Sequence, residues 1–166
     1  MSGVLPNQEI EKLIEVGSIT SDVPIDPEQI QPASLDLRLG GKAFRIRASF
    51  LPGSREKVED RLNSLKMHEI DLIDGAVLEK GCVYLVPLLE ELNLSPDIQA
   101  AANAKSSTGR LDLLTRVITN SGEEFDRVSS GYCGKLYAEI CPRSFSVLVR
   151  QGMKLNQIRF RNKNTT

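Results

Sequence analysis

Two cations, two serines and a glycine lie within six consecutive residues, from Lys105 to Arg110. The preceding segment, Ile98–Ala102, has apolar residues at every second position, which is typical of a strand. A chain of phosphates needs fixed cations, hydroxyl donors and backbone N–H groups that a glycine leaves accessible. A polar turn between two strands has the same composition. The segment therefore supports two interpretations, a phosphate-binding loop or a plain turn.

A second segment combines a tight turn with a strand that carries a carboxylate. Gly131 and Gly134 flank an aromatic residue, which indicates a turn that leads into a strand. Period-two alternation then separates the two faces of that strand. The core face is predicted to carry Leu136, Ala138 and Ile140, and the other face Lys135, Tyr137 and Glu139. Glu139 then lies beside an aromatic ring and within reach of a cation, or else on a solvated edge where its pairing with Lys135 contributes little.

Composition limits the partners that these segments can have. The chain has 166 residues, with 21 basic and 22 acidic residues and a net charge of −1. Its length suits one domain with a buried core. Without a basic field, we expect no nucleic-acid partner and no attraction to anionic membranes. No apolar run is long enough to span a bilayer and the start of the chain is acidic, so we expect a cytoplasmic protein.

The cysteines and the single histidine argue against a zinc site. Cys82, Cys133 and Cys141 are widely spaced and form no CxxC motif, and His68 alone cannot build a two-histidine site. The H-x-E and P-C-x-x-C motifs of zinc-dependent nucleobase deaminases are absent from the sequence. We therefore expect no zinc and no metal held by side chains. A histidine-dependent nucleophilic triad would have to use His68 itself.

The remaining sequence predicts two helices and many short strands. One helix begins near Asn7, has Ile10, Leu13 and Ile14 on one face, and ends at Gly17, and a second covers about 55–65. Period-two alternation bounded by Gly, Pro and Asp indicates an all-β domain, either a two-sheet sandwich or a barrel. The predicted strands cover residues 35–39, 44–48, 70–72, 77–78, 82–86, 98–102, 136–140, 145–149 and 155–160, and Pro87 ends the fifth of them.

Four motifs in a fixed order resemble one known family. They are the Lys-Ser-Ser-x-x-Arg run at 105–110, the Gly-aromatic-x-Gly turn at 131–134 with Glu139 after it, and the supporting segments 30–40 and 151–157. From Leu5 to Phe160 the chain resembles the dCTP deaminase and dUTPase superfamily, and the deaminase branch is the closer match. The resemblance implies an all-β, dUTPase-like distorted jelly-roll or β-clip barrel with an N-terminal helix and one short extra helix. It also implies a single deaminase-like domain over residues 1–166, similar to the first half of a longer two-half member and without the C-terminal lid.

The resemblance implies a role for each residue of these motifs. Glu139 is the acid–base that deaminates dCTP to dUTP and ammonia, Arg110 keeps it ionised and positioned, and Ser106 helps to hold the water. This agrees with the lack of zinc motifs, because a partly desolvated carboxylate must then activate the water. The implied substrate contacts are Lys105, Ser106, Ser107, Thr108, Gly109, Arg110, Ser129, Tyr137 and Glu139. Mg²⁺ is expected on the triphosphate, and the family's homotrimers, or a pseudo-trimer, place each site between subunits.

Two departures from the family pattern keep other functions open. Lys105 stands where the family has arginine, and Ser129 stands where it has the aspartate that contacts the sugar, although Asp126 lies three residues earlier. One alternative is a dUTP pyrophosphatase or a bifunctional deaminase and dUTPase, in which water attacks phosphorus. Another is a non-catalytic half that binds nucleotide or supports assembly. Selection of cytosine over uracil would depend on backbone groups near residues 117–128.

Overall fold

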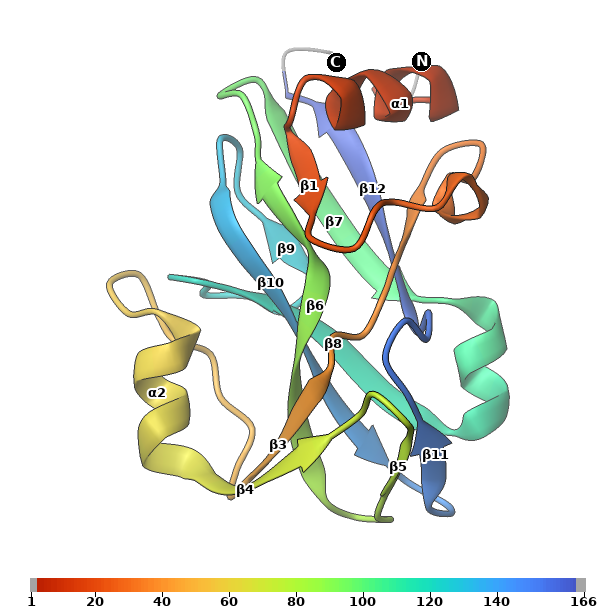
Figure 1. Ribbon diagram of the computed structural model, residues 1–166. Coiled ribbons are helices and arrows are strands. Elements are labelled where there is room, and N and C mark those ends of the chain that lie inside the picture. Colours follow the sequence, from red (N-terminus) through yellow and green to blue (C-terminus); the bar gives the residue numbers. More distant parts are fainter. Residues whose placement is uncertain (1–2, 164–166) are drawn as a thin grey trace.

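Antiparallel strands make up most of the protein, which a computed structural model describes over residues 3–163 (Figure 1). Within that range the helices are α1 (Asn7–Glu15), α2 (Val58–Leu65) and the short 3-10 helices η1 (Pro27–Gln29) and η2 (Ser106–Leu111). The strands are β1 (Ile19–Ser21), β2 (Leu35–Leu37), β3 (Lys42–Ile46), β4 (Lys66–Asp71), β5 (Ala76–Leu78), β6 (Val83–Asn93), β7 (Ile98–Ala104), β8 (Leu113–Thr119), β9 (Arg127–Val128), β10 (Cys133–Pro142), β11 (Val147–Val149) and β12 (Asn156–Asn162). None of the helices between residues 3 and 163 has the length and apolar character needed to cross a bilayer. The predicted all-β class is confirmed.

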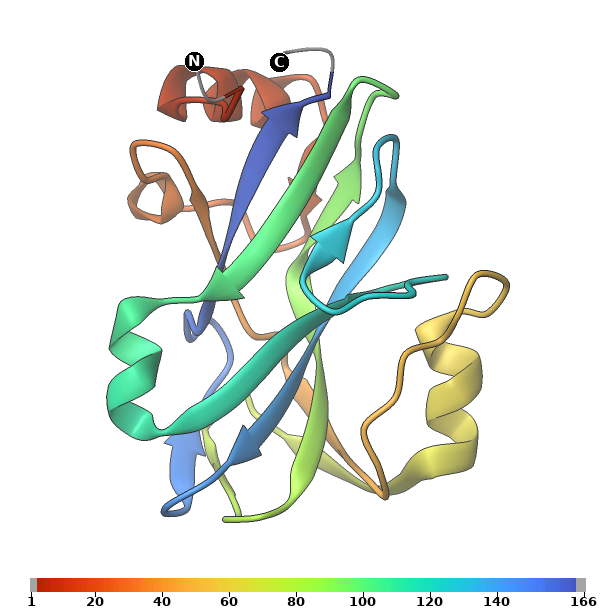
Figure 2. The same cartoon turned by 180° about the vertical axis from the view of Figure 1, so that it is seen from behind.

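Two sheets carry the fold. The larger sheet has the strand order β4-β3-β6-β10-β8, with β1 pairing to β6, and the smaller sheet has the order β2-β12-β7-β9. A separate pair, β5 and β11, lies at the end of the molecule opposite α1 (Figure 1). In Figure 2, which turns the molecule by 180°, β7, β9 and β12 of the smaller sheet lie on the near side.

The main core lies between the two sheets. Ile158 and Phe160 of β12 are fully buried there, together with Ala138 and Ile140 of β10. Leu136 belongs to the same cluster, so the core face of β10 is the one that its alternation predicted. Burial of each large apolar side chain stabilises the fold by roughly 1.5–3 kcal/mol. Because this core fixes the register of β10, it also fixes which side chains face outward.

The outer face of β10 is buried as well, because α2 lies over it. Tyr137 packs with Ile118 of β8, and Val58 and Leu62 of α2 belong to the same second cluster. β10 is a central strand, with β6 on one side and β8 on the other. Tyr137 and Glu139 are each only 2% exposed, so the alternative of a solvated edge is wrong.

Several element boundaries differ from the predicted ones. β6 does not end before Pro87 but continues to Asn93, and its register against β10 shifts between Lys135 and Tyr137. Such an irregularity accommodates a residue that has no N–H group for the ladder. The Pro87 carbonyl instead accepts from Gly40 N at 2.9 Å, and a Cβ on Gly40 would lie 2.5 Å from that oxygen. The sequence patterns also missed β1, β8 and β9.

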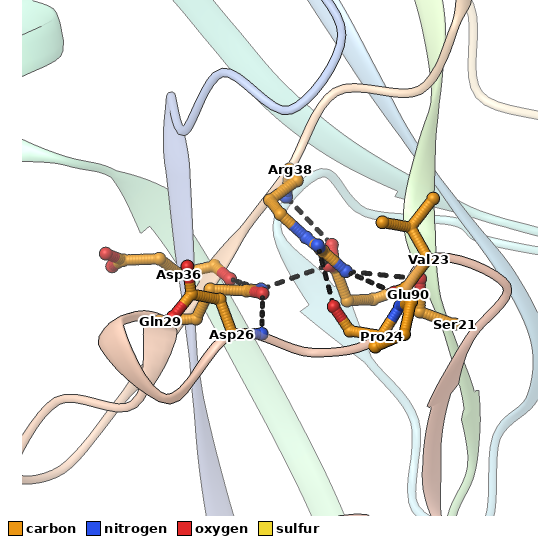
Figure 3. A network of polar contacts seen from close by, with 8 residues as sticks. All are labelled: Ser21, Val23, Pro24, Asp26, Gln29, Asp36, Arg38 and Glu90. Atoms are coloured by element: carbon orange, nitrogen blue, oxygen red, sulfur yellow. Dashed lines mark hydrogen bonds and ion pairs between the residues drawn. The ribbon is translucent and has the colours of Figure 1, made fainter.

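A buried ion pair holds the N-terminal segment against the sheets (Figure 3). Glu90 of β6 is fully buried, and its Oε2 accepts from Arg38 Nε at 2.7 Å and from Gln29 Nε2 at 3.1 Å. Its Oε1 accepts from the backbone N–H of Arg38 at 2.8 Å. The Arg38 guanidinium also donates to Val23 O and Pro24 O, at 2.8 and 3.1 Å. Both carboxylate oxygens are thus hydrogen-bonded, which is the condition under which a protein tolerates a buried charge.

Candidate active site

The predicted phosphate loop forms the 3-10 helix η2, between β7 and β8. Two donors tie this loop to one carbonyl. The backbone N–H of Lys105 donates to Leu155 O at 2.9 Å, and the Thr108 hydroxyl donates to the same oxygen at 2.7 Å. Thr108 is 1% exposed. The structure therefore gives Thr108 an anchoring role in place of the predicted substrate contact.

Lys105 is committed to an ion pair at the base of this loop. Its Nζ pairs with Oδ2 of Asp36, a residue of β2 that is 2% exposed. The ammonium compensates a buried carboxylate and is not a free cation for phosphate. The members of the predicted loop that are exposed, and that a ligand can reach, are Ser106, Ser107, Gly109 and Arg110.

Glu139 lies on β10 directly opposite Arg116 of β8. Its Oε2 accepts from Arg116 Nε at 3.0 Å and from Arg116 Nη2 at 2.6 Å. Its Oε1 is buried and has no hydrogen-bond partner among residues 3–163. A buried carboxylate that one guanidinium compensates, and that keeps one oxygen free, can accept a proton from a water placed against that oxygen.

Within one chain, the guanidinium on Glu139 comes from Arg116 and not from Arg110. Arg116 Nη2 also donates to Ser49 Oγ at 3.1 Å, and the guanidinium carbon lies 3.7 Å from the centre of the Phe125 ring. Sequence reasoning missed Arg116 because no predicted strand covered 113–119. Pairing that stretch with β10 would have placed Arg116 beside Glu139, and its apolar, β-branched composition was the available signal.

The predicted turn between Gly131 and Gly134 is confirmed, and it ties β10 to the end of β8. The Tyr132 hydroxyl donates to Lys135 O at 2.6 Å and accepts from the Asn120 backbone N–H at 3.0 Å. Gly134 has a φ of 154°, and a Cβ at this position would lie 2.9 Å from the Tyr132 hydroxyl oxygen. Burial raises the pKa of Tyr132, so its hydroxyl stays protonated and keeps both bonds.

Tyr137 belongs to the second core. Its ring packs with Ile118 beneath α2. Burial raises the pKa of Tyr137, and the charge of Glu59 acts in the same direction. A nucleobase cannot stack on a ring that is 2% exposed, so the side chain of Tyr137 has a packing role, and a substrate contact through its backbone stays a prediction.

A cavity of about 690 Å³ lies beside the loop that follows β8. Ser129, a predicted substrate contact, is in its wall, and so is Phe125, whose ring also faces Arg116. Burial raises the pKa of Asp126, although the N–H of Val117, which donates to its Oδ1 at 2.8 Å, opposes this effect. The charged residues of the wall are Glu124, Asp126, Arg127, Arg159 and Arg161. Phe125 thus joins the wall of this cavity to Arg116, the ion-pair partner of Glu139.

The two predicted halves of the site remain separate in a single chain. The hydrogen bonds of Glu139 run to Arg116, and over the described residues none joins Glu139 to Ser106 or Arg110. Their convergence across a subunit boundary stays a prediction. In the part of the chain that the structure describes, no three His, Cys, Asp or Glu residues are grouped so that they could hold a metal ion.

Comparison with known proteins decides the family. The profile of the 2'-deoxycytidine 5'-triphosphate deaminase (DCD) N-terminal domain matches residues 1–164. The chain belongs to this family. This confirms the resemblance drawn from the motifs. A crystal structure of 2'-deoxycytidine 5'-triphosphate deaminase from Agrobacterium tumefaciens is 55% identical to this deaminase domain and matches 97% of it with a TM-score of 0.94. The domain spans 48% of that crystallised chain.

Two further relatives bear on the product of the reaction. The proteins named "dCTP deaminase, dUMP-forming" from Beutenbergia cavernae and from Tropheryma whipplei (strain Twist) are 29% and 30% identical to this domain over 158 residues. Each match covers 95% of this chain, with 78% and 76% of the respective relative. These names give dUMP as the product, whereas the motifs led us to expect dUTP.

Proposed function

We propose that this domain deaminates dCTP by hydrolysis, with Glu139 as the catalytic acid–base. The observation that carries the proposal is the carboxylate of Glu139, buried beside Arg116 with its Oε1 free of any hydrogen-bond partner within residues 3–163. Membership in the deaminase-domain family supports the choice of substrate. The 55% identity to the Agrobacterium tumefaciens deaminase supports it further.

Glu139 would act as a proton carrier. Its Oε1 takes a proton from the water whose oxygen bonds to C4 of cytosine, and N3 receives a proton as the tetrahedral intermediate forms. Glu139 then carries the proton of the C4 hydroxyl to the amine, the C4–N bond breaks as the C4 carbonyl forms, and ammonia leaves. Water and dCTP thus give dUTP and ammonia, and the carboxylate returns to its ionised form.

The exposed face of η2 is suited to the triphosphate. Ser106 and Ser107 offer hydroxyl donors, Gly109 has no side chain to hinder a ligand, and Arg110 offers a guanidinium that can bind phosphate oxygens in pairs. Lys105 adds positive charge at the edge of this group, although Asp36 already shares it. We propose that the phosphates lie on these four exposed residues and that the sugar lies toward Ser129 in the cavity wall.

The proposal includes assembly, because over the described residues no hydrogen bond or ion pair joins η2 to Glu139 within one chain. A homotrimer or pseudo-trimer would bring η2 of one unit to Glu139 of another. We propose that Mg²⁺ arrives on the nucleotide, bound to its phosphates. Bound in this way, Mg²⁺ would neutralise phosphate charge. The cytoplasmic location stays a prediction.

A second candidate function is the formation of dUMP, which the names of the Beutenbergia cavernae and Tropheryma whipplei relatives favour. It adds a step in which water attacks phosphorus and pyrophosphate leaves. Asp126 is the carboxylate in the cavity wall that is nearest in sequence to Ser129, where the family has its sugar-binding aspartate. Oδ1 of Asp126 accepts from the backbone N–H of Val117, so a water or a sugar hydroxyl would bind Oδ2.

Incubation with dCTP, and separately with dUTP, each with Mg²⁺, separates these functions. Ammonia and dUTP from dCTP support the first function, and ammonia with dUMP and pyrophosphate supports the second. Pyrophosphate from dUTP without ammonia from dCTP would contradict deamination, and no product from either would indicate a non-catalytic half. The matched control is Glu139→Gln, which keeps the shape of the side chain and should slow ammonia release by about 10²–10⁴-fold while nucleotide binding persists.

A further inference from the structure

Arg116 connects three segments that meet beside the carboxylate of Glu139. From β8, its Nε and Nη2 both reach Oε2 of Glu139, at 3.0 and 2.6 Å. Nη2 also donates to Ser49 Oγ at 3.1 Å, in the segment between β3 and α2. The guanidinium lies over the ring of Phe125, in the loop between β8 and β9. A hydroxyl and an aromatic face thus hold the guanidinium independently of the carboxylate.

We infer that Arg116 is the positioning residue of Glu139, an inference that rests on the proposed deamination. Two N–H groups of Arg116 donate to a single oxygen, so rotation of the carboxylate would break two charged hydrogen bonds at once. Oε1 is then the oxygen that stays available to a reacting water. The adjacent positive charge also stabilises the ionised form of the carboxylate, which is the form that a base needs. Arg116 acts through Glu139 and touches no reacting atom.

The shape of the guanidinium matters to this role. A planar fork can place Nε and Nη2 on one oxygen while Nη2 also donates to Ser49, whereas a lysine ammonium is a single point charge on a flexible stem. Phe125 extends the arrangement to the substrate side, because its ring also lines the 690 Å³ cavity. The position of Glu139 is therefore supported by the same loop that forms part of the cavity wall.

The test measures kcat and KM for ammonia release from dCTP by the purified protein and its variants. Arg116→Ala should lower kcat by about 100-fold with KM little changed, as expected when a catalytic group is misplaced by about 1 Å. Arg116→Lys, which keeps the charge and is expected to fold, should recover part of that loss. The matched control is Arg45→Ala, which removes another ion-paired arginine of the same sheet, 3.7 Å from Glu79, and should leave kcat unchanged.

The double variant Arg116→Ala/Glu139→Gln decides whether Arg116 acts through Glu139. It should be no slower than Glu139→Gln alone, because a positioning residue has nothing left to position. Losses that multiply, a change in KM alone, or a wild-type kcat in Arg116→Lys and Arg116→Ala would each overturn the inference. If the wild-type protein releases no ammonia, the proposed function itself fails, so the two failures are distinguishable.

Discussion

Two arginine–glutamate pairs with buried carboxylates differ in how completely the carboxylate is hydrogen-bonded. Glu90 accepts at both oxygens, from Arg38 and Gln29. Among the described residues, Glu139 accepts at one oxygen only, from Arg116. Both carboxylates are at most 2% exposed, so burial does not distinguish them. What distinguishes the two carboxylates is the number of their oxygens that accept a hydrogen bond.

The difference shows how a structural ion pair and a reactive one can share a fold. Backbone carbonyls surround the guanidinium of Arg38, and no carboxylate oxygen of its partner is left over (Figure 3). Each guanidinium also donates to a serine hydroxyl, that of Arg38 to Ser21 and that of Arg116 to Ser49. Arg116 in addition lies over the ring of Phe125, a residue of the cavity wall. A compensated carboxylate with one free oxygen can still take a proton. The hydrogen bond that this oxygen does not make lowers the stability of the fold.

Glu90→Gln should produce the largest loss of stability. The change leaves the charge of Arg38 buried without compensation and turns an amide N–H₂ toward groups that are themselves donors. We expect the free energy of unfolding to fall by about 3–5 kcal/mol in urea denaturation. A loss of less than about 1 kcal/mol, typical of a surface pair, would remove the contrast between the two sites.

A smaller effect is expected when one donor is removed from the complete network. Gln29 is fully buried, and its Nε2 donates both to Glu90 and to Asp36 O, the latter at 2.8 Å. Gln29→Leu keeps the volume but deletes both of these bonds and the one that Gln29 Oε1 accepts from Asp26 N at 2.9 Å, and it should cost about 1–3 kcal/mol in the same assay. Gln31→Ala is the control, because it removes a half-buried glutamine whose Nε2 donates to Glu28 O and not to Glu90, and it should stay within about 0.5 kcal/mol of wild type.

The smallest expected effect is a pH dependence of the folding stability that arises from Asp126. Burial raises the pKa of Asp126, and Arg116 opposes that rise. Since the folded-state pKa lies above the unfolded one, this residue's contribution to stability is present in acid and is lost as the pH rises through the raised value. The asparagine of Asp126→Asn does not titrate. The urea midpoint of this variant, minus that of wild type, should therefore increase between about pH 4 and pH 7. An equal difference between the two proteins at both pH values would contradict this.

Local features of the site could be predicted from the sequence. The turn at Gly131 and Gly134 and the alternation of Leu136 to Ile140 depend on neighbours in the chain, and both are confirmed. Motif spacing pointed to Glu139 and to the exposed part of η2. The family is likewise confirmed, because four motifs in order carry more information than any one of them.

Features that depend on long-range pairing could not be predicted. Arg116 meets Glu139 only because β8 pairs with β10 in one register, and β8 was not recognised as a strand. Lys105 and Thr108 were predicted to contact the substrate. In the structure Lys105 pairs with Asp36, and the Thr108 hydroxyl donates to Leu155 O, and both partners are distant in sequence. Tyr137 is covered by α2, whose packing against the sheet no local pattern indicates. In each case a partner remote in the chain decides the role of the side chain.

The central claim is that Glu139 is buried for reaction and Glu90 for stability. Measuring ammonia release from dCTP and the urea midpoint of Glu139→Gln, side by side with Glu90→Gln, tests it most directly. We predict that Glu139→Gln releases ammonia at least about 100-fold more slowly than wild type and keeps its unfolding midpoint, whereas the midpoint of Glu90→Gln falls. A Glu139→Gln protein that deaminates at the wild-type rate, or that unfolds as readily as Glu90→Gln, would contradict the account.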